Sequence, residues 1–86
     1  MEPGKFYLFC CPFFWTYVGR FVREPNFMRI ELADAIYFTR TGATFDILCS
    51  KGLQPDSIIV GPFKTYFIPA NPTGITPWEA KTPWAK

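Results

Sequence analysis

The sequence predicts an all-β protein: a small barrel of five strands, with one short inserted helix and an extended C-terminal tail rich in proline and tryptophan. Three observations lead to this prediction. Two alternating runs flank Arg23-Glu24-Pro25-Asn26, which is typical of a hairpin. A helical period replaces the alternation only at residues 44–51. Four of the nine prolines fall in Pro69–Lys86, where no regular alternation remains.

The N-terminal part predicts two strands. Lys5–Cys11 is apolar after its lysine, so we expect this strand to be buried on both faces or packed at an interface. Pro12 cannot donate a ladder hydrogen bond and marks a bulge, a corner or an edge. Phe13–Arg23 continues as a long strand, and Gly19 inside it indicates the bend where a small barrel turns its corner.

The second arm of the hairpin is Phe27–Leu32. Its period of two places Met28, Ile30 and Leu32 on one buried face and the intervening Arg29 and Glu31 on the other face. Ile36–Arg40 follows the turn-like Ala33-Asp34-Ala35. It either continues the previous strand past a bulge or forms a separate strand.

The segment 44–51 has the signals of a short helix lying over one end of the barrel. Thr44 can cap its N-terminus, and Asp46 favours the positive end of the helix. Lys51 lies in the last turn and Gly52 is placed to end the helix. The apolar positions fall at i, i+3 and i+4: Phe45, Leu48 and Cys49.

The remaining chain predicts two strands and the tail. Ser57–Val60 and Phe63–Ile68 are strands separated by a break at Gly61-Pro62, so residues 1–68 form the barrel domain. Residues 69–86 form the tail, in which TPWEAK is nearly repeated as TPWAK. Its prolines favour extended chain, which makes Trp78 and Trp84 anchors. They either cover the open end of their own barrel or dock into a neighbouring subunit.

Aromatic content predicts self-assembly. The chain of 86 residues carries ten Phe, four Tyr and three Trp, more than one small domain can bury. Large apolar patches are rarely left in water, so we expect copies of the chain to cover one another. The leading hypothesis is a non-enzymatic, self-assembling barrel. Its interface candidates are Phe13, Trp15, Tyr66, Trp78 and Trp84.

A second hypothesis is an oligomeric ring that binds or sequesters a small nucleotide or RNA between subunits. The net charge of +2 is too weak for a clustered basic footprint, so this hypothesis depends on cations interleaved with aromatic rings. The candidate ligand-binding residues are Arg20, Arg29, Arg40, Tyr37 and Lys64.

Enzyme chemistry has little support in the sequence. There is no histidine, which excludes Cys–His and Ser–His nucleophiles and removes the usual acid–base group at neutral pH. Cys10, Cys11 and Cys49 lack the C-x-x-C spacing of structural zinc sites. We therefore expect no catalytic residue, no metal and no cofactor.

The chain is expected to be cytoplasmic. Cys10 and Cys11 are neighbours that point to opposite faces of a strand, so three reduced, buried cysteines are the natural interpretation. The apolar run Phe6–Val18 is too short to span a bilayer as a helix and contains Pro12. No small-residue cleavage site follows it, so we expect neither a secretory signal nor a membrane partner.

Residues 17–68 resemble the Sm-like small barrels, which have a five-stranded SH3-type fold. Gly19, Phe21, Met28 and Leu32 match the spacing of the family's first motif, but Pro25 and Arg29 replace its acid and its asparagine. Its second motif resembles Ile58–Gly61 leading to Tyr66–Ile68, with Val60 in place of the arginine, and the helix at 44–51 is an insertion. The resemblance implies barrel topology and edge-to-edge ring assembly, but not uridine-type RNA binding.

The chain also resembles short proteins found in phages and bacteria. The shared pattern is a G-R-[hydrophobe]-V strand, an L-x-D-A segment, a T-G turn and a C-terminal tryptophan. This resemblance implies a bacterial or viral origin, with a cytoplasmic or, for a phage protein, virion-associated location. It implies no activity.

Overall fold

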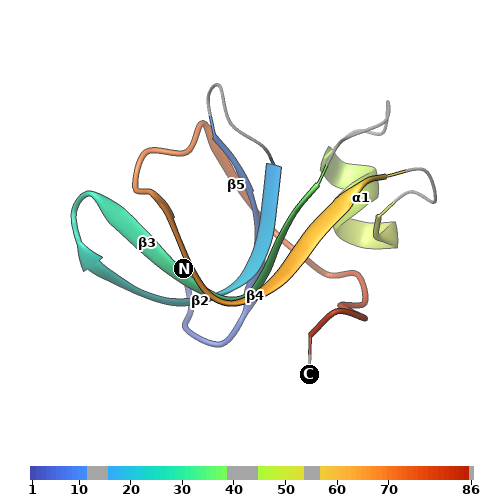
Figure 1. Cartoon of the computed structure of the whole chain (residues 1–86). Coiled ribbons are helices and arrows are strands. Elements are labelled where there is room, and N and C mark those ends of the chain that lie inside the picture. The colour runs from blue at the N-terminus through green and yellow to red at the C-terminus, as the bar shows by residue number, and fades with distance from the viewer. Residues whose placement is uncertain (12–15, 39–44, 54–56, 86) are drawn as a thin grey trace.

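The computed structural model describes residues 1–11, 16–38, 45–53 and 57–85. These residues form one antiparallel sheet of five strands in the order β4-β3-β2-β1-β5, with a short helix between β3 and β4 (Figure 1). The elements are β1 (Phe6–Cys10), β2 (Thr16–Asn26), β3 (Arg29–Phe38), α1 (Phe45–Lys51), β4 (Ile59–Pro69) and β5 (Gly74–Pro77). The predicted all-β class with one short helix is confirmed.

The predicted hairpin is present, but its turn lies later in the chain than expected. β2 runs on to Asn26, and the turn is formed by Phe27 and Met28. Between Arg23↔Glu31 and Asn26↔Arg29 the ladder has an extra residue on β2, so Pro25 lies in a bulge, where a missing N–H is tolerated. The predicted burial of Met28 is wrong, because this residue is at the exposed tip.

The sheet is apolar on both faces. The first core cluster consists of Tyr7, Phe9, Cys11, Tyr17, Phe21, Ile30, Leu32, Ala35 and Ile68. The second core cluster consists of Leu8, Val18, Ile36, Phe38, Leu48, Cys49 and Trp78. Successive β1 residues alternate between the two clusters, as the pleat of a strand requires. The prediction that the first strand is buried on both faces is therefore confirmed.

A bulge at Asp34 divides β3. Val18 pairs with Ile36 and Arg20 with Ala33, so β3 has one extra residue here, and Asp34 has a φ of 48°. Gly19 lies opposite this bulge, where a Cβ would be 3.0 Å from the Ala35 Cβ. Beyond the bulge the strand continues to Phe38, which confirms one of the two alternatives for this segment. Residues 39 and 40 lie outside the described residues.

β4 is one continuous strand, and the two separate strands predicted for 57–60 and 63–68 are wrong. A second bulge, between the pairs Ala35↔Phe63 and Tyr37↔Val60, accommodates Gly61-Pro62 within the strand. Gly61 has a φ of +126°, and a Cβ there would be 2.9 Å from the carbonyl oxygen of Ala35. The predicted break is thus a bulge that only glycine permits.

The predicted helix is confirmed as α1. Gly52 ends it with a φ of +98°, and its N–H donates to the carbonyl oxygen of Leu48 at 2.9 Å. Leu48 and Cys49 are the buried positions of this helix, and they cover the second core cluster. The proposed cap, Thr44, lies outside the described residues.

The segment predicted as an irregular tail contains the fifth strand. β5 pairs with β1 from Tyr7↔Pro77 to Cys10↔Gly74, and the Thr73 N–H donates to the Cys10 carbonyl at 2.6 Å. After β5 the chain crosses the second core cluster, and the N–H groups of Glu79 and Ala80 both donate to the Cys49 carbonyl at 2.8 Å. This tail segment, residues 78–85, therefore packs on its own chain.

The bulge predicts a contrast between two glycines. Gly19→Ala should destabilise the fold by about 1–3 kcal/mol, because the added methyl would meet the side chains of Leu32 and Ala35 at 3.0 Å. Gly74→Ala is the matched control, because its nearest neighbour, the Cys10 Cβ, would be 3.9 Å away. Urea unfolding measures both. Equal stabilities of the two variants would contradict the close approach at Gly19.

Candidate functional site

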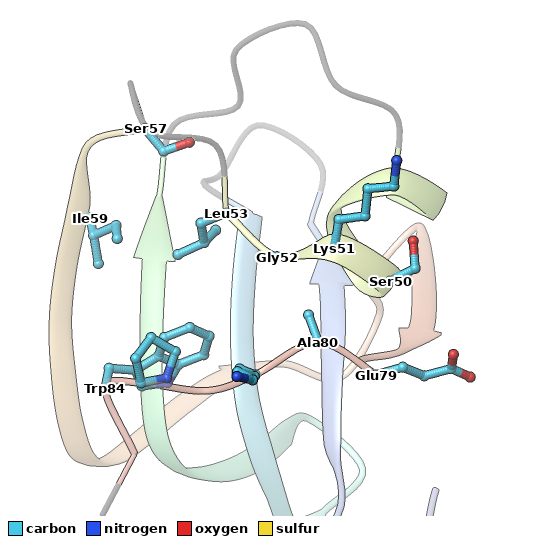
Figure 2. A pocket seen from close by; sticks show the side chains of 11 residues that line it. Ser50, Lys51, Gly52, Leu53, Ser57, Ile59, Glu79, Ala80 and Trp84 are labelled. Atoms are coloured by element: carbon cyan, nitrogen blue, oxygen red, sulfur yellow. The ribbon is translucent and has the colours of Figure 1, made fainter.

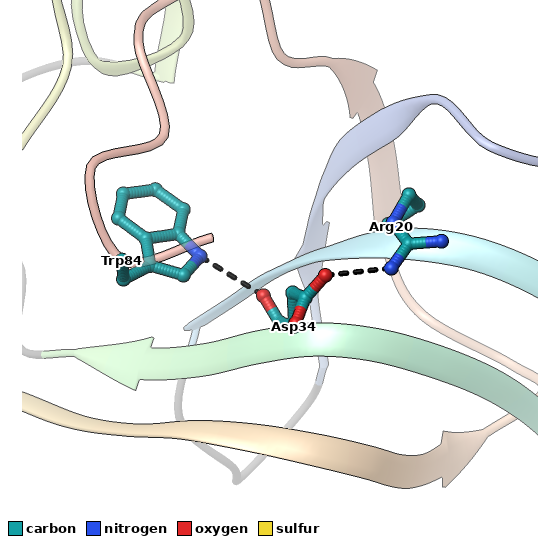
Figure 3. Close-up of polar contacts among 3 residues, drawn as sticks. All are labelled: Arg20, Asp34 and Trp84. Atoms are coloured by element: carbon teal, nitrogen blue, oxygen red, sulfur yellow. Dashed lines mark hydrogen bonds and ion pairs between the residues drawn. The ribbon is translucent and has the colours of Figure 1, made fainter. Parts of the chain in front are cut away.

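Three residues join the tail segment to the middle of the sheet (Figure 3). The Nε1–H of Trp84 donates to the backbone carbonyl of Asp34 at 2.9 Å. The guanidinium of Arg20 donates to the carboxylate of the same aspartate at 2.6 Å. Because Asp34 is the bulged residue of β3, the bulge presents its carbonyl to the tail and its side chain to β2.

The main effect of Asp34 is to position the side chains of Trp84 and Arg20. Its ion pair adds little to the stability of the fold. The side chains of Arg20 and Asp34 are 39% and 21% exposed, and a pair this accessible contributes at most about 1 kcal/mol. The predicted turn at Ala33-Asp34-Ala35 is wrong, and the partnership with Arg20 was not predicted. The tolerance of Asp for positive φ is the sequence signal that points to a bulge here.

The two tail tryptophans lie against their own chain. Trp78 is 6% exposed in the second core cluster, and its ring meets that of Trp84 edge to face at 6.0 Å between centroids. Trp84 is half-buried. The sequence left open whether these tryptophans cover their own barrel or dock into a neighbouring subunit. In this arrangement they pack on the chain's own sheet. The Nε1–H of Trp78 has no hydrogen-bond partner within the described residues.

A hollow of about 640 Å³, here called the tail hollow, lies between the end of α1, the start of β4 and the tail segment (Figure 2). Its apolar walls come from Leu53, Ile59, Ala80, Pro83 and Trp84. Ser57 also lines it, with a buried hydroxyl that has no partner in the part of the chain that the structure describes.

The tail hollow carries charges of both signs among its lining residues. Lys51 and Lys81 are both exposed lysines, and Glu79 is an exposed carboxylate. An apolar floor with a mixed charged lining suits a partner that carries an apolar group flanked by charges.

A smaller hollow of about 440 Å³ also has Trp84 in its wall. It is lined by Arg20, Asp34, Pro62, Phe63, Lys64 and Trp84. Two of the predicted ligand-binding cations, Arg20 and Lys64, therefore come together. The carboxylate of Asp34 already neutralises the first of them, which leaves one net positive charge.

Arg29, Tyr37 and Tyr66 are not in the lining of the smaller hollow. The guanidinium of Arg29 lies over the ring of Phe67, 5.7 Å from its centroid, and makes a cation–π contact. This contact lies near the end of β4 that is beside the β2–β3 hairpin tip. Tyr37 and Tyr66 are 6.3 Å apart between ring centroids and belong to an aromatic cluster that shares Phe63 with the lining of the smaller hollow. Phe13, Trp15 and Arg40 lie outside the described residues. Of the four predicted ligand-binding residues that the structure describes, Arg20 and Lys64 thus share a hollow, while Arg29 and Tyr37 are not in its lining.

This aromatic cluster consists of Tyr17, Tyr37, Phe63 and Tyr66. Phe63 stacks on Tyr37 at 5.8 Å between ring centroids and contacts Tyr66 at 5.0 Å. Burial, with a smaller contribution from Tyr66, raises the pKa of Tyr17 to about 12. The cluster therefore keeps a neutral phenol against the first core cluster throughout the physiological range.

The cysteines are structural in their setting. Cys11 and Cys49 are buried, and none of the three cysteines is in a disulfide. Burial, together with the neighbouring Cys10, raises the pKa of the Cys11 thiol above its usual value. A thiol with a raised pKa is a poor nucleophile at neutral pH. The described residues include no cluster of three or more Cys, Asp or Glu that could hold a metal ion.

Apolar side chains remain exposed at the margins of the sheet. At the hairpin tip, Phe27 is 89% and Met28 is 68% exposed. Others lie on or beside the edge strands: Ile58, Ile59 and Phe67 at β4, and Ile75 on β5. The sequence analysis did not predict that Phe27 and Met28 are exposed, because it extended the alternation of the strand into the turn.

Comparison of the chain with protein-family models, with curated proteins and with solved structures finds no match in any of the three. No helix in the described ranges is both long and apolar enough to cross a membrane.

The contact between tail and bulge predicts the effect of Trp84→Phe. This variant loses the hydrogen bond to Asp34 but keeps a ring in place, and should cost about 0.5–1.5 kcal/mol. Amide exchange should accelerate at Glu79 and Ala80. Asp34→Asn is the control, because it keeps the backbone acceptor and changes only the half-exposed ion pair. Unchanged exchange in Trp84→Phe would contradict a role for this bond in holding the tail.

The raised pKa of Tyr17 predicts a loss of stability in alkali. The unfolded phenol ionises near pH 10 and the folded one near pH 12, so the folded state holds the extra proton between these values. The stability is complete below pH 10 and falls by at most about 1.4 kcal/mol per pH unit up to pH 12. Urea unfolding of Tyr17→Phe across this range should show a shallower decline; identical slopes would contradict the prediction.

Proposed function

We propose that this protein is a non-enzymatic module that assembles with copies of itself through the open edges of its sheet. The observation that supports this proposal is the placement of its exposed apolar side chains. Within the described ranges, most of the large exposed ones lie on or beside an edge strand or at the hairpin tip, and only Met1 and Ile47 lie elsewhere. Apolar groups gathered at unpaired strands favour pairing with another chain.

β4 is the stronger candidate edge. Its stretch Phe63–Ile68 contains no proline or glycine and a single charge, Lys64. Among the described residues it pairs only with β3, so its outer edge offers backbone groups to a second strand. Pro62 and Pro69 bound the stretch and limit how far such pairing can extend.

β5 is the second open edge. It is only four residues long and carries Ile75, which is 42% exposed. A standard interface buries about 800 Å² on each partner. The accessible surface of the chain is 5432 Å², so two such interfaces would use less than a third of it. Both edges can therefore take part in assembly.

The finer features of the fold and the location are also proposals. We propose that the sheet belongs to an Sm-like barrel, which is supported by the bulges at Asp34 and Gly61-Pro62 that let long strands bend. A cytoplasmic location, or a virion for a phage protein, is supported by Cys10, Cys11 and Cys49, none of which is in a disulfide.

A second candidate function is capture of a small nucleotide or RNA. Its specific support is the smaller hollow, where Arg20 and Lys64 lie beside Trp84. In this candidate site both cations, Arg20 and Lys64, belong to one chain, whereas the hypothesis from the sequence was a site between subunits. The absorbance of purified protein at 260 nm, before and after denaturation, tests it. A spectrum without released nucleotide, and no binding of added nucleotide, would remove this candidate.

Assembly predicts a solution mass above that of one chain. Light scattering across a concentration series should give a multiple of 9.9 kDa. The double variant Thr65→Lys/Phe67→Lys places two charges on β4 and should lower the mass at each concentration, because charged edges resist pairing. Ile47→Lys, the same kind of change on α1, should leave the mass of the assembly unchanged.

The wild-type mass decides the proposal. A single-chain mass at every concentration would overturn self-assembly. A mass that is unchanged in the β4 variant would retain assembly and reject this edge as its route. Truncation after Ala70 is not a useful test, because it would delete β5 and uncover the second core cluster.

A further inference from the structure

We propose that the hairpin tip of one copy, Phe27 and Met28, inserts into the tail hollow of the next copy. This inference rests on the proposed self-assembly and names a second contact for it. The tip is the most exposed apolar feature in the described chain, with Phe27 at 89% and Met28 at 68% exposure. These two neighbouring side chains form an apolar knob that is mostly uncovered, although Pro69, Ala70 and Asn71 line a hollow beside it.

Two hydrogen bonds hold the backbone of the knob in place. The side-chain oxygen of Asn26 accepts a hydrogen bond from the Met28 N–H at 2.8 Å. The Met28 carbonyl accepts one from the Ala70 N–H at 3.1 Å, which ties the tip to the chain after β4. A turn whose backbone is already ordered loses less conformational freedom on binding, so more of the apolar burial appears as affinity.

The tail hollow has room for this knob. An apolar cavity of about 150 Å³ holds a benzene ring. The tail hollow measures about 640 Å³, is open to solvent, and has walls from Leu53, Ile59, Pro83 and Trp84. The ring of Phe27 can lie against the indole of Trp84, and aromatic pairs contribute beyond their buried area.

The charges near the two surfaces are compatible. Glu24 precedes the tip and is exposed, without an ion pair among the described residues, while Arg29 follows the tip. Arg23 is already paired with Glu31 at 3.0 Å. The hollow offers Lys51 and Lys81 to Glu24, and Glu79 to Arg29. Such a pattern favours one orientation of the incoming hairpin.

The positions of knob and hollow require two different chains. The β2–β3 hairpin projects from one end of the molecule, and α1 lies at the other (Figure 1). The knob therefore cannot fill the hollow of its own chain. Each copy carries one of each, so the contact is heterologous and propagates into a ring or a filament.

A complementation experiment tests this contact. In the tip variant, Phe27→Asp/Met28→Ser, the knob is polar and the hollow is intact. In the hollow variant, Lys81→Glu/Pro83→Glu, the knob is intact and the hollow has lost a cation and gained carboxylates. All four positions are exposed, so circular dichroism and thermal unfolding should match those of the wild type. Ile47→Ser is the matched control for the loss of an exposed apolar side chain.

Each variant alone should associate roughly 30-fold or more weakly than the wild type. The tip variant loses the burial of a large apolar side chain, and the hollow variant places carboxylates against the apolar knob and Glu24. An equimolar mixture should regain association between one intact knob and one intact hollow. In such a pair the second knob and the second hollow both carry substitutions. This contact can therefore join two chains but no more. Light scattering at concentrations where each variant alone is at its lowest mass measures this recovery.

Three outcomes would overturn the inference. Both variants could assemble as the wild type does, the mixture could show no recovery, or the tip variant alone could form the same pairs. In each case an assembling wild type would leave the proposed function standing, with the β4 edge as its remaining route. A wild type of single-chain mass would remove both proposals.

Discussion

The fold depends on covering a sheet that is apolar on both faces. Tyr7 and Phe9 of β1 face the first core cluster, while Leu8 between them faces the second. A lone three-stranded meander would leave one of these faces in water. The second face is covered by two separate segments, α1 through Leu48 and the tail segment through Trp78. The short chain therefore uses its C-terminal residues as part of its core.

The bulges make this cover possible. At Asp34 the extra residue in β3 turns the backbone carbonyl toward Trp84 and the carboxylate toward Arg20. At Gly61 the extra residue in β4 brings this strand so close to β3 that a Cβ on Gly61 would lie 2.9 Å from the carbonyl oxygen of Ala35. Both positions interrupt the regular pairing of β3. They let long strands change direction, and the first also supplies the attachment point for the tail.

Covering both faces does not use all the apolar side chains. The ones left over collect where strands end or lack a neighbour, at Phe27, Met28, Phe67 and Ile75. At the same time, the tail segment leaves hollows on either side of Trp84 instead of a flat surface. The proposed association with further copies rests on these features: an exposed apolar tip, a hollow beside Trp84 and the edges of the sheet.

The sequence by itself determined the β class, the hairpin and the helix, because each depends on local periodicity and on terminators such as Gly52. It also indicated that Gly19 was special and that β1 was buried on both faces. The tertiary structure alone decided the register at Asp34, the continuity of β4 through Pro62, and the exposure of Met28. It also decided that Gly74–Pro77 is a strand and that Trp84 lies beside Arg20. The physical reason is that a strand, unlike a helix, is completed by hydrogen bonds to residues far along the chain. A four-residue edge strand or a single bulged residue has too few local signals to be recognised before its partner is in place.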